Sequence, residues 1–247
     1  MRLFSPYHAH IGMQRRAFAW YGTGMFAPRP QPIPLDETAV SVEITLISII
    51  EGFALAALAA SILPADGLPF EYIPYAAAGL VFILVFWSQS VLHTVSFIRW
   101  PLSPSHMLLY FVAALSQVVA YGHLTDPAEW FLWWFFFAII GGILYIVDLG
   151  IIRRERPAFA RLPNGEAFID IVEKRHIYEM RTIVIAALIF NGGAYALFAF
   201  NPSFAASSNI VFIVGLVQLV PSLFTLVDSV RNFSRRARLI SGLYPNS

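Results

Sequence analysis

A few polar side chains lie inside the long apolar stretches of this sequence, and they are its candidates for chemistry: Glu51, Gln89, His93, Gln117, Asp148, Asn191 and Gln218. Ionisable residues inside a membrane are costly, and they usually face the interior of a helix bundle or water. Glu51 is the only carboxylate near the middle of its stretch. It could therefore set ion selectivity or pH dependence on a transport path, or it could be a neutral group that hydrogen-bonds to a neighbouring helix.

The other polar groups have structural interpretations that stay open. Glutamine and asparagine usually form hydrogen bonds between membrane helices. Asp148 and Asp228 lie near the ends of their stretches, where pairing with a nearby arginine is the simplest interpretation. His93 could be a packed histidine or a ligand.

Several kinds of active site are excluded by the residues that are present. The chain has no cysteine, so it has neither disulfides nor thiolate metal sites. Haem would need axial histidines at one depth on facing helices, and only His93 and His106 could form such a pair. A retinal Schiff base needs a lysine inside the membrane, whereas Lys174 lies between two apolar stretches. We expect no catalytic residues, no metal site and no cofactor, and we do not expect an enzyme.

The composition indicates which fold must position these side chains. Of the 247 residues, 58% are hydrophobic and 13% are charged, against about 25% charged residues in an ordinary soluble domain. A soluble protein of this size could not cover so much apolar surface with polar groups. The sequence therefore predicts an all-α integral membrane protein whose partner is the lipid bilayer. It excludes a soluble enzyme and gives no indication of nucleic-acid binding.

Six stretches are apolar enough to cross a bilayer, which needs about 20 residues per helix. Their expected bounds are Val40–Leu63, Tyr72–Phe97, Ser105–Leu124, Glu129–Ile152, Thr182–Phe200 and Asn209–Val230. Between the fourth and fifth lies a long loop, residues 153–181. We expect it to hold one short amphipathic helix, after Pro163, that lies on the membrane surface.

The positions of the basic residues predict the orientation. All 16 lysines and arginines lie before the first stretch, after the second, in the long loop or after the sixth. Because cytoplasmic loops are enriched in such residues, both termini should be cytoplasmic in a multi-pass protein of the plasma (inner) membrane. Residues 1–39 then form a cytoplasmic or interfacial arm, 40–230 the six-helix domain with its cytoplasmic loop, and 231–247 a basic tail. Trp130, Trp133 and Trp134 are expected in an aromatic belt at the outer face.

One segment resembles a known family. Ser48 to Ala56, with the acidic-glycine pair Glu51-Gly52, is similar to the first helix of the prokaryotic relatives of the lysosomal potassium channel. Phe86-Trp87 with the later His93, and the run from Phe111 to Leu115, are also similar to that family. The family's arginine and its Phe-Ser-Asp triplet are absent. The resemblance implies an oligomeric potassium-permeable channel built around the first helix, with Leu55 and Leu58 as pore-lining candidates.

Two functions follow as hypotheses. The first is a small polytopic transport protein of the oligomeric cation channel type. The alternative is a non-catalytic structural or accessory subunit of a larger membrane complex. The first stretch carries small residues at helical spacing, which would allow close packing with a second copy or with another membrane subunit: Gly52, Ala56, Ala59 and Ala60.

Overall fold

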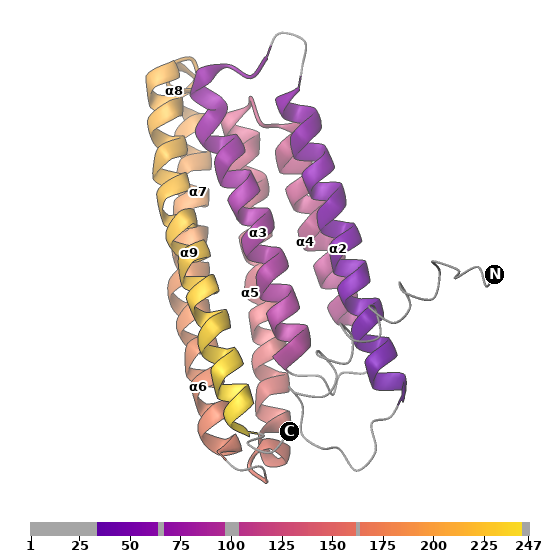
Figure 1. Ribbon diagram of the computed structural model, residues 1–247. Helices are drawn as coiled ribbons and strands as arrows, with labels where there is room; N and C mark the ends of the chain where they lie inside the picture. The colour runs from indigo at the N-terminus through magenta and orange to yellow at the C-terminus, as the bar shows by residue number, and fades with distance from the viewer. Residues whose placement is uncertain (1–33, 64–66, 97–103, 162–163, 244–247) are drawn as a thin grey trace, which may run out of the picture.

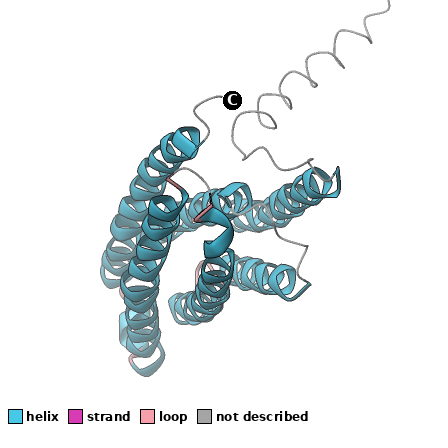
Figure 2. Cartoon of the chain, turned by 90° about the horizontal axis from the view of Figure 1, so that it is seen from below, coloured by secondary structure: helices cyan, strands magenta, loops and turns pink. Residues whose placement is uncertain are grey.

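The computed structural model describes residues 34–63, 67–96, 104–161 and 164–243 (Figure 1). Within these ranges the chain forms helices and short connections, with no strand (Figure 2). The elements are α2 (Pro34–Ile62), the 3₁₀ turn η1 (Phe70–Tyr72), α3 (Ile73–Ser96), α4 (Pro104–Gly122), α5 (Pro127–Phe159), α6 (Gly165–Glu179), the π-helical turn η2 (Met180–Val184), α7 (Ile185–Phe200), α8 (Pro202–Ala205) and α9 (Ser208–Leu243).

Five of the described helical segments are long and apolar enough to cross a membrane, namely Ile44–Ile62, Phe70–Val91, Pro127–Phe159, Gly165–Phe200 and Ser208–Phe233. A further apolar segment, His106–Gly122 of α4, is shorter. The all-helical class is confirmed, and these helices are compatible with a membrane protein. Helices suit a bilayer because each backbone N–H and C=O is satisfied within its own segment.

The long helices form two layers (Figure 1). In one layer α3 lies between α2 and α9, and in the other α5 lies between α4 and α7. The layers meet where α2 packs against α4 and where aromatic side chains of α3 and α5 touch. We call the end that carries η1 and α8 the upper end, and the end that carries α6 the lower end. The two central helices, α3 and α5, therefore each contact two neighbours within their layer and meet each other across the layers.

The structure corrects the expected bounds at the lower end. The long loop is mostly helical, because α5 continues to Phe159 and α6 runs through η2 into α7 without a break. The helix expected after Pro163 does form, but it packs along α5 instead of lying on a membrane surface. Ion pairs that join α5 to α6 explain the difference, since they hold the two helices side by side. The expected basic tail is also helical, as far as Leu243.

At the other boundary α2 begins at Pro34, so the last residues of the expected arm 1–39 are helical. The rest of the arm lies outside the described residues. The start of α5 has a clear local cause. The side chain of Asp126 accepts hydrogen bonds from the backbone N–H groups of Ala128 and Glu129, at 3.1 and 3.2 Å. Pro127 occupies the first helical position, where its missing N–H costs nothing.

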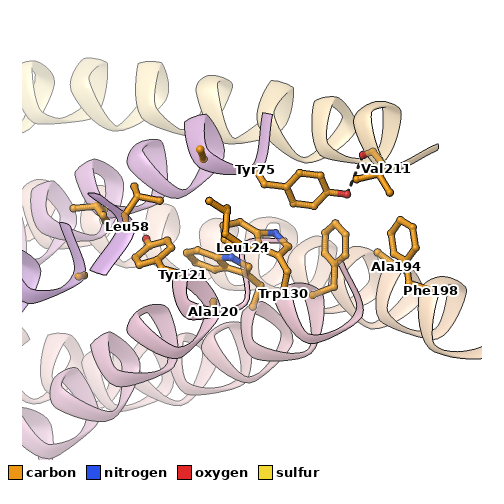
Figure 3. Packing of buried hydrophobic residues seen from close by; sticks show 14 residues of the cluster. Leu58, Tyr75, Ala120, Tyr121, Leu124, Trp130, Ala194, Phe198 and Val211 are labelled. Carbon is orange, nitrogen blue, oxygen red and sulfur yellow. Dashed lines mark hydrogen bonds between the residues drawn. The ribbon is translucent and has the colours of Figure 1, made fainter. Parts of the chain in front are cut away.

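An aromatic core fills the upper half of the bundle (Figure 3). Tyr75, Tyr121, Trp130, Phe131 and Trp134 are all buried there. The rings of Tyr75 and Trp130 meet edge to face with centroids 5.6 Å apart, and those of Trp130 and Trp134 are also 5.6 Å apart. The expected aromatic belt is therefore wrong for Trp130 and Trp134. Both face the other layer, and neither is available to headgroups.

Two glycines allow the layers and helices to come this close. A Cβ atom on Gly215 of α9 would lie 2.6 Å from the ring of Tyr75, and one on Gly79 of α3 would lie 2.8 Å from the ring of Tyr121. Such separations are far inside normal contact distance. The hydroxyl of Tyr75 donates to the carbonyl of Val211, at 2.9 Å (Figure 3), so its ring is held across the surface of α9.

We expect Gly215→Ala to destabilise the bundle by about 1–3 kcal/mol, because the added methyl group overpacks a ring that a hydrogen bond holds in place. The measurement is the thermal unfolding midpoint of the purified protein in mild detergent. Gly193→Ala in α7 is the matched control, since no atom lies within 4 Å of its added Cβ. A Gly215→Ala midpoint equal to that of the control would contradict the packing described here.

Candidate functional site

Glu51 is buried between α2 and its neighbours, with a relative exposure of 4%. It lies about 16 Å from the end of α2 at Ile62, counting 1.5 Å per residue, and so falls well inside the apolar segment Ile44–Ile62. Neither carboxyl oxygen has a hydrogen-bond partner. Buried polar groups are nearly always paired, so this carboxyl is the most unusual group in the described part of the chain.

The helix that packs against α2 in the other layer carries a second incomplete polar group. Gln117 of α4 is fully buried, and its side-chain Nε2 has no acceptor. The hydroxyl of Tyr121, one turn along α4, lies 3.0 Å from the carbonyl oxygen of Gly79 and 3.3 Å from Oε1 of Gln117. Gln117 and Tyr121 both belong to α4, which packs against α2, the helix of Glu51. Sequence reasoning selected Glu51 and Gln117 but missed Tyr121, which looks like one more aromatic residue in an apolar run.

The amides near the middle of α7 and α9 form a separate network. Nε1 of Trp130 donates to Oε1 of Gln218 at 2.8 Å, and Nε2 of Gln218 donates to Oδ1 of Asn191 at 3.3 Å. Asn191 in turn donates to the carbonyl of Ala187. These bonds join α5, α9 and α7, as expected for amides that link membrane helices. Their donors and acceptors are used within the network, which favours the structural interpretation of Asn191 and Gln218.

Gln89 links α3 to α9, because its Nε2 donates to the hydroxyl of Ser229 at 2.9 Å. Its Oε1 has no partner. The side chain of His93 lies outside the described residues. Gln89 therefore forms one hydrogen bond between helices, and the described residues do not test His93 as a ligand.

Asp148 is paired with a histidine. Its Oδ1 lies 3.1 Å from Nε2 of His106, and both residues are buried. The pair joins α4 to α5 in the lower half of the bundle. His106 also packs edge to face on Tyr110. Sequence analysis assigned no role to His106 with Asp148, because the two residues are far apart in the chain and His106 stands at the start of its helix.

A cluster of charges ties the lower ends of α5, α6 and α9 together. Nε of Arg175 bonds to Oε1 of Glu179 at 2.7 Å, and its Nη2 bonds to Asp228 of α9. The hydroxyl of Tyr145 in α5 donates to Glu179, at 3.3 Å. The expected arginine partner of Asp228 is thus confirmed. Glu179 is 1% exposed, so Arg175 supplies the charge that balances a buried carboxylate.

A second group of ion pairs lies further down, beyond the apolar stretches. Arg153 bonds to Glu173 at 2.8 Å, and Arg156 bonds to Glu173 at 3.0 Å and also to Asp170. The hydrogen bond from Arg153 holds the pKa of the Glu173 carboxyl below its ordinary value. Exposed pairs of this kind contribute little singly, but together they fix α6 against α5.

The predicted pore-lining residues of α2 do not share one side of the helix. Leu58 is 2% exposed and belongs to the core, whereas Leu55 is 47% exposed. The small residues Gly52, Ala56, Ala59 and Ala60 are exposed on the outside of the bundle. Leu55 and Leu58 border an apolar groove between α2 and α3. The small residues of α2 therefore face the outside of the bundle, whereas Glu51 faces its interior.

Glu51 is the described carboxyl that is buried with both of its oxygens unpartnered. Among the residues that the structure describes, no three His, Asp or Glu side chains gather into a metal site. No known protein family, curated protein or solved structure matches this chain. The geometry of Glu51 is accordingly the main guide to function.

We expect Arg175→Met to lower the stability of the protein by about 2–4 kcal/mol, because it leaves the buried Glu179 without its cation. The check is the thermal unfolding midpoint in detergent at neutral pH. Arg154→Met is the matched control, since Arg154 is exposed at the end of α5. If the two variants unfolded at the same temperature, the cluster would contribute nothing to stability.

Proposed function

We propose that the chain is a multi-pass protein of the plasma (inner) membrane with six spans and cytoplasmic termini. The sixth span would be α4. Its 19 residues give a length of about 28 Å at 1.5 Å per residue, close to the roughly 30 Å of a hydrocarbon core. It also runs alongside α2 and α5 (Figure 1).

The exposed faces of the long helices support one membrane boundary near the lower end. Along the outer face of α6, η2 and α7, the exposed residues change from Lys174, Tyr178 and Arg181 to Ile185 and Ile189. Similar transitions occur near Arg153 in α5 and near Arg231 in α9. Basic and aromatic residues followed by aliphatic ones are typical of a helix that passes from headgroups into hydrocarbon. The three helices then project below the membrane, where the ion pairs lie.

Reporter domains inserted at Gly67, Asp126 and Asn201 should all report the outer side, whereas fusions at Asn164 and at the C-terminus should report the cytoplasm. The reason is that every lysine and arginine lies in the segments that are expected on the same side as Asn164 and the C-terminus, and cytoplasmic segments are enriched in these residues. The measurement is the activity of a reporter that functions in one compartment only. A cytoplasmic signal from any of the first three positions would contradict six spans.

We further propose that the protein transports a cation, and the observation that carries this proposal is the buried, unpartnered carboxyl of Glu51. An ionised carboxylate in an apolar interior costs several kcal/mol when it lacks a partner. A group that only linked helices would use its oxygens, as the amides of Asn191 and Gln218 do. Glu51 uses neither oxygen, so an exchangeable cation is the natural partner.

The distribution of polar groups suggests how such transport would be controlled. The lower half of the bundle holds Asp148 with His106 and Glu179 with Arg175. The upper half is closed by the aromatic core. A path through one protomer would therefore reach Glu51 more easily from below, and the packed rings would have to move before an ion could leave at the upper end. This fits a gated transporter or channel better than an open pore.

Self-association through α2 is part of the proposal, as the potassium-channel resemblance implies. The exposed Gly52, Ala56, Ala59 and Ala60 would let two copies of α2 approach closely. In such an oligomer Leu55, which is exposed, could contact another copy. Leu58 is only 2% exposed, so it would contribute little surface to such a contact.

Purified protein in liposomes should carry a cation flux that Glu51→Gln reduces by roughly tenfold or more, the effect of about 1.4 kcal/mol of altered ion binding. The amide keeps the shape of the side chain but cannot be charged. Glu166→Gln is the matched control, because Glu166 is exposed on α6. Ion flux and particle mass are measured on the same samples. Equal flux in wild type and Glu51→Gln would remove Glu51 from the transport path.

The alternative is a structural or accessory subunit of a larger membrane complex. The apolar groove between α2 and α3, bordered by Leu55, Leu58, Ile62, Ala76 and Leu80, favours it, because a foreign helix could pack there. Under this alternative the protein carries no flux by itself. It would co-purify with another membrane protein at a fixed stoichiometry.

A further inference from the structure

If the protein transports a cation as proposed, Glu51 binds either a metal ion or a proton. A dehydrated metal cation needs several oxygen ligands, about six to eight in the case of Ca²⁺. A proton needs a single oxygen. The surroundings of Glu51 can therefore be compared with these two requirements.

α3 and α4 pack against α2, the helix that carries Glu51, and the polar groups described on them offer few free oxygens. The single proton of the Tyr121 hydroxyl is shared between the carbonyl oxygen of Gly79, at 3.0 Å, and Oε1 of Gln117, at 3.3 Å. Gln117 offers instead its unpartnered Nε2, which is a donor. A donor repels a metal ion but can stabilise a carboxylate, directly or through one water molecule.

The titratable side chains that the structure describes on the neighbouring helices have partners of their own. From α4, His106 pairs with Asp148, and Tyr110 is buried against that histidine. From α3, the hydroxyl of Tyr75 donates to Val211. The described residues of α3 and α4 include no lysine or arginine that could neutralise Glu51, and His106 is already paired with Asp148.

We propose that Glu51 is a reversible proton-binding site and that Gln117 and Tyr121 are its positioning residues. In the protonated state one Glu51 oxygen carries an O–H bond and the group is neutral. On release that bond breaks, the proton passes to a water molecule as hydronium, and the carboxylate is stabilised by the N–H of Gln117. The site joins three helices, because Glu51 is on α2, Gln117 and Tyr121 are on α4, and Gly79 is on α3.

Infrared spectroscopy of the full-length protein in lipid tests this proposal directly. A protonated carboxyl has a C=O band separate from the carboxylate bands, and the band shifts in D₂O. We expect such a band at neutral pH, its reversible loss at alkaline pH, and its absence from Glu51→Gln. Glu166→Gln should keep it. Gln117→Leu should change the pH at which the band disappears, which a purely steric role for Gln117 would not do.

Three results would overturn the proton site. One is the absence of the band at every pH at which the protein stays folded. Another is a band that persists until the protein unfolds, since Glu51 would then be permanently neutral. The third is a band that weakens at fixed pH as potassium chloride replaces choline chloride, since Glu51 would then bind the metal ion. If Glu51→Gln does not fold, Glu51→Asp keeps the test valid, because it retains a carboxyl and should move the frequency of the band only if the band belongs to this residue.

Liposome assays separate this inference from the transport function. Proton flux that is lost in Glu51→Gln supports both. A titrating band without flux of any cation would leave the proton site standing and overturn transport. Potassium flux that is independent of pH and unaffected by Glu51→Gln would keep transport and overturn the proton as the transported ion.

Discussion

The scarcity of hydrogen-bond partners in an apolar interior is the constraint on which this structure depends. Each buried polar group must find a partner within the protein, because hydrocarbon supplies none. The chain meets this demand through a few bonds between helices, such as Trp130 to Gln218, Gln218 to Asn191, and Gln89 to Ser229. These bonds also fix which helix lies beside which. Against this background the unpaired Glu51 is an exception that requires a physical reason.

Close packing satisfies the same constraint where polar bonds are absent. In lipid the association of helices depends on van der Waals contact and on small residues that let backbones approach. Gly79 and Gly215 serve this purpose, because each receives a tyrosine ring whose hydroxyl then reaches a backbone carbonyl. Each of these glycines thus allows both a packing contact and a hydrogen bond. The aromatic core is the result, and it closes the upper half of the bundle.

Much of the fold could be predicted from the sequence, since apolar length and turn residues determine where membrane helices begin and end. The position of Glu51 in a long apolar helix could be predicted in the same way. Its unpaired state could not, because pairing depends on what α4 presents to α2. The partnership of His106 with Asp148 was hidden for a similar reason, as the two residues lie on different helices. Trp130 and Trp134 were misplaced because a tryptophan near a helix end is compatible with both headgroups and a core.

At the lower end, charged residues join helices that continue beyond their apolar stretches. Residues 153–181 carry too many charges for hydrocarbon, and sequence periodicity alone suggests a surface helix there. The charges instead pair across α5, α6 and α9, so that Arg175 holds Glu179 and Asp228 in one contact. The π-helical turn at Met180–Val184 lies directly above this contact, and π turns interrupt the regular hydrogen bonding of a helix. A polar contact that joins α5, α6 and α9 therefore lies beside a locally irregular segment of the α6–α7 helix.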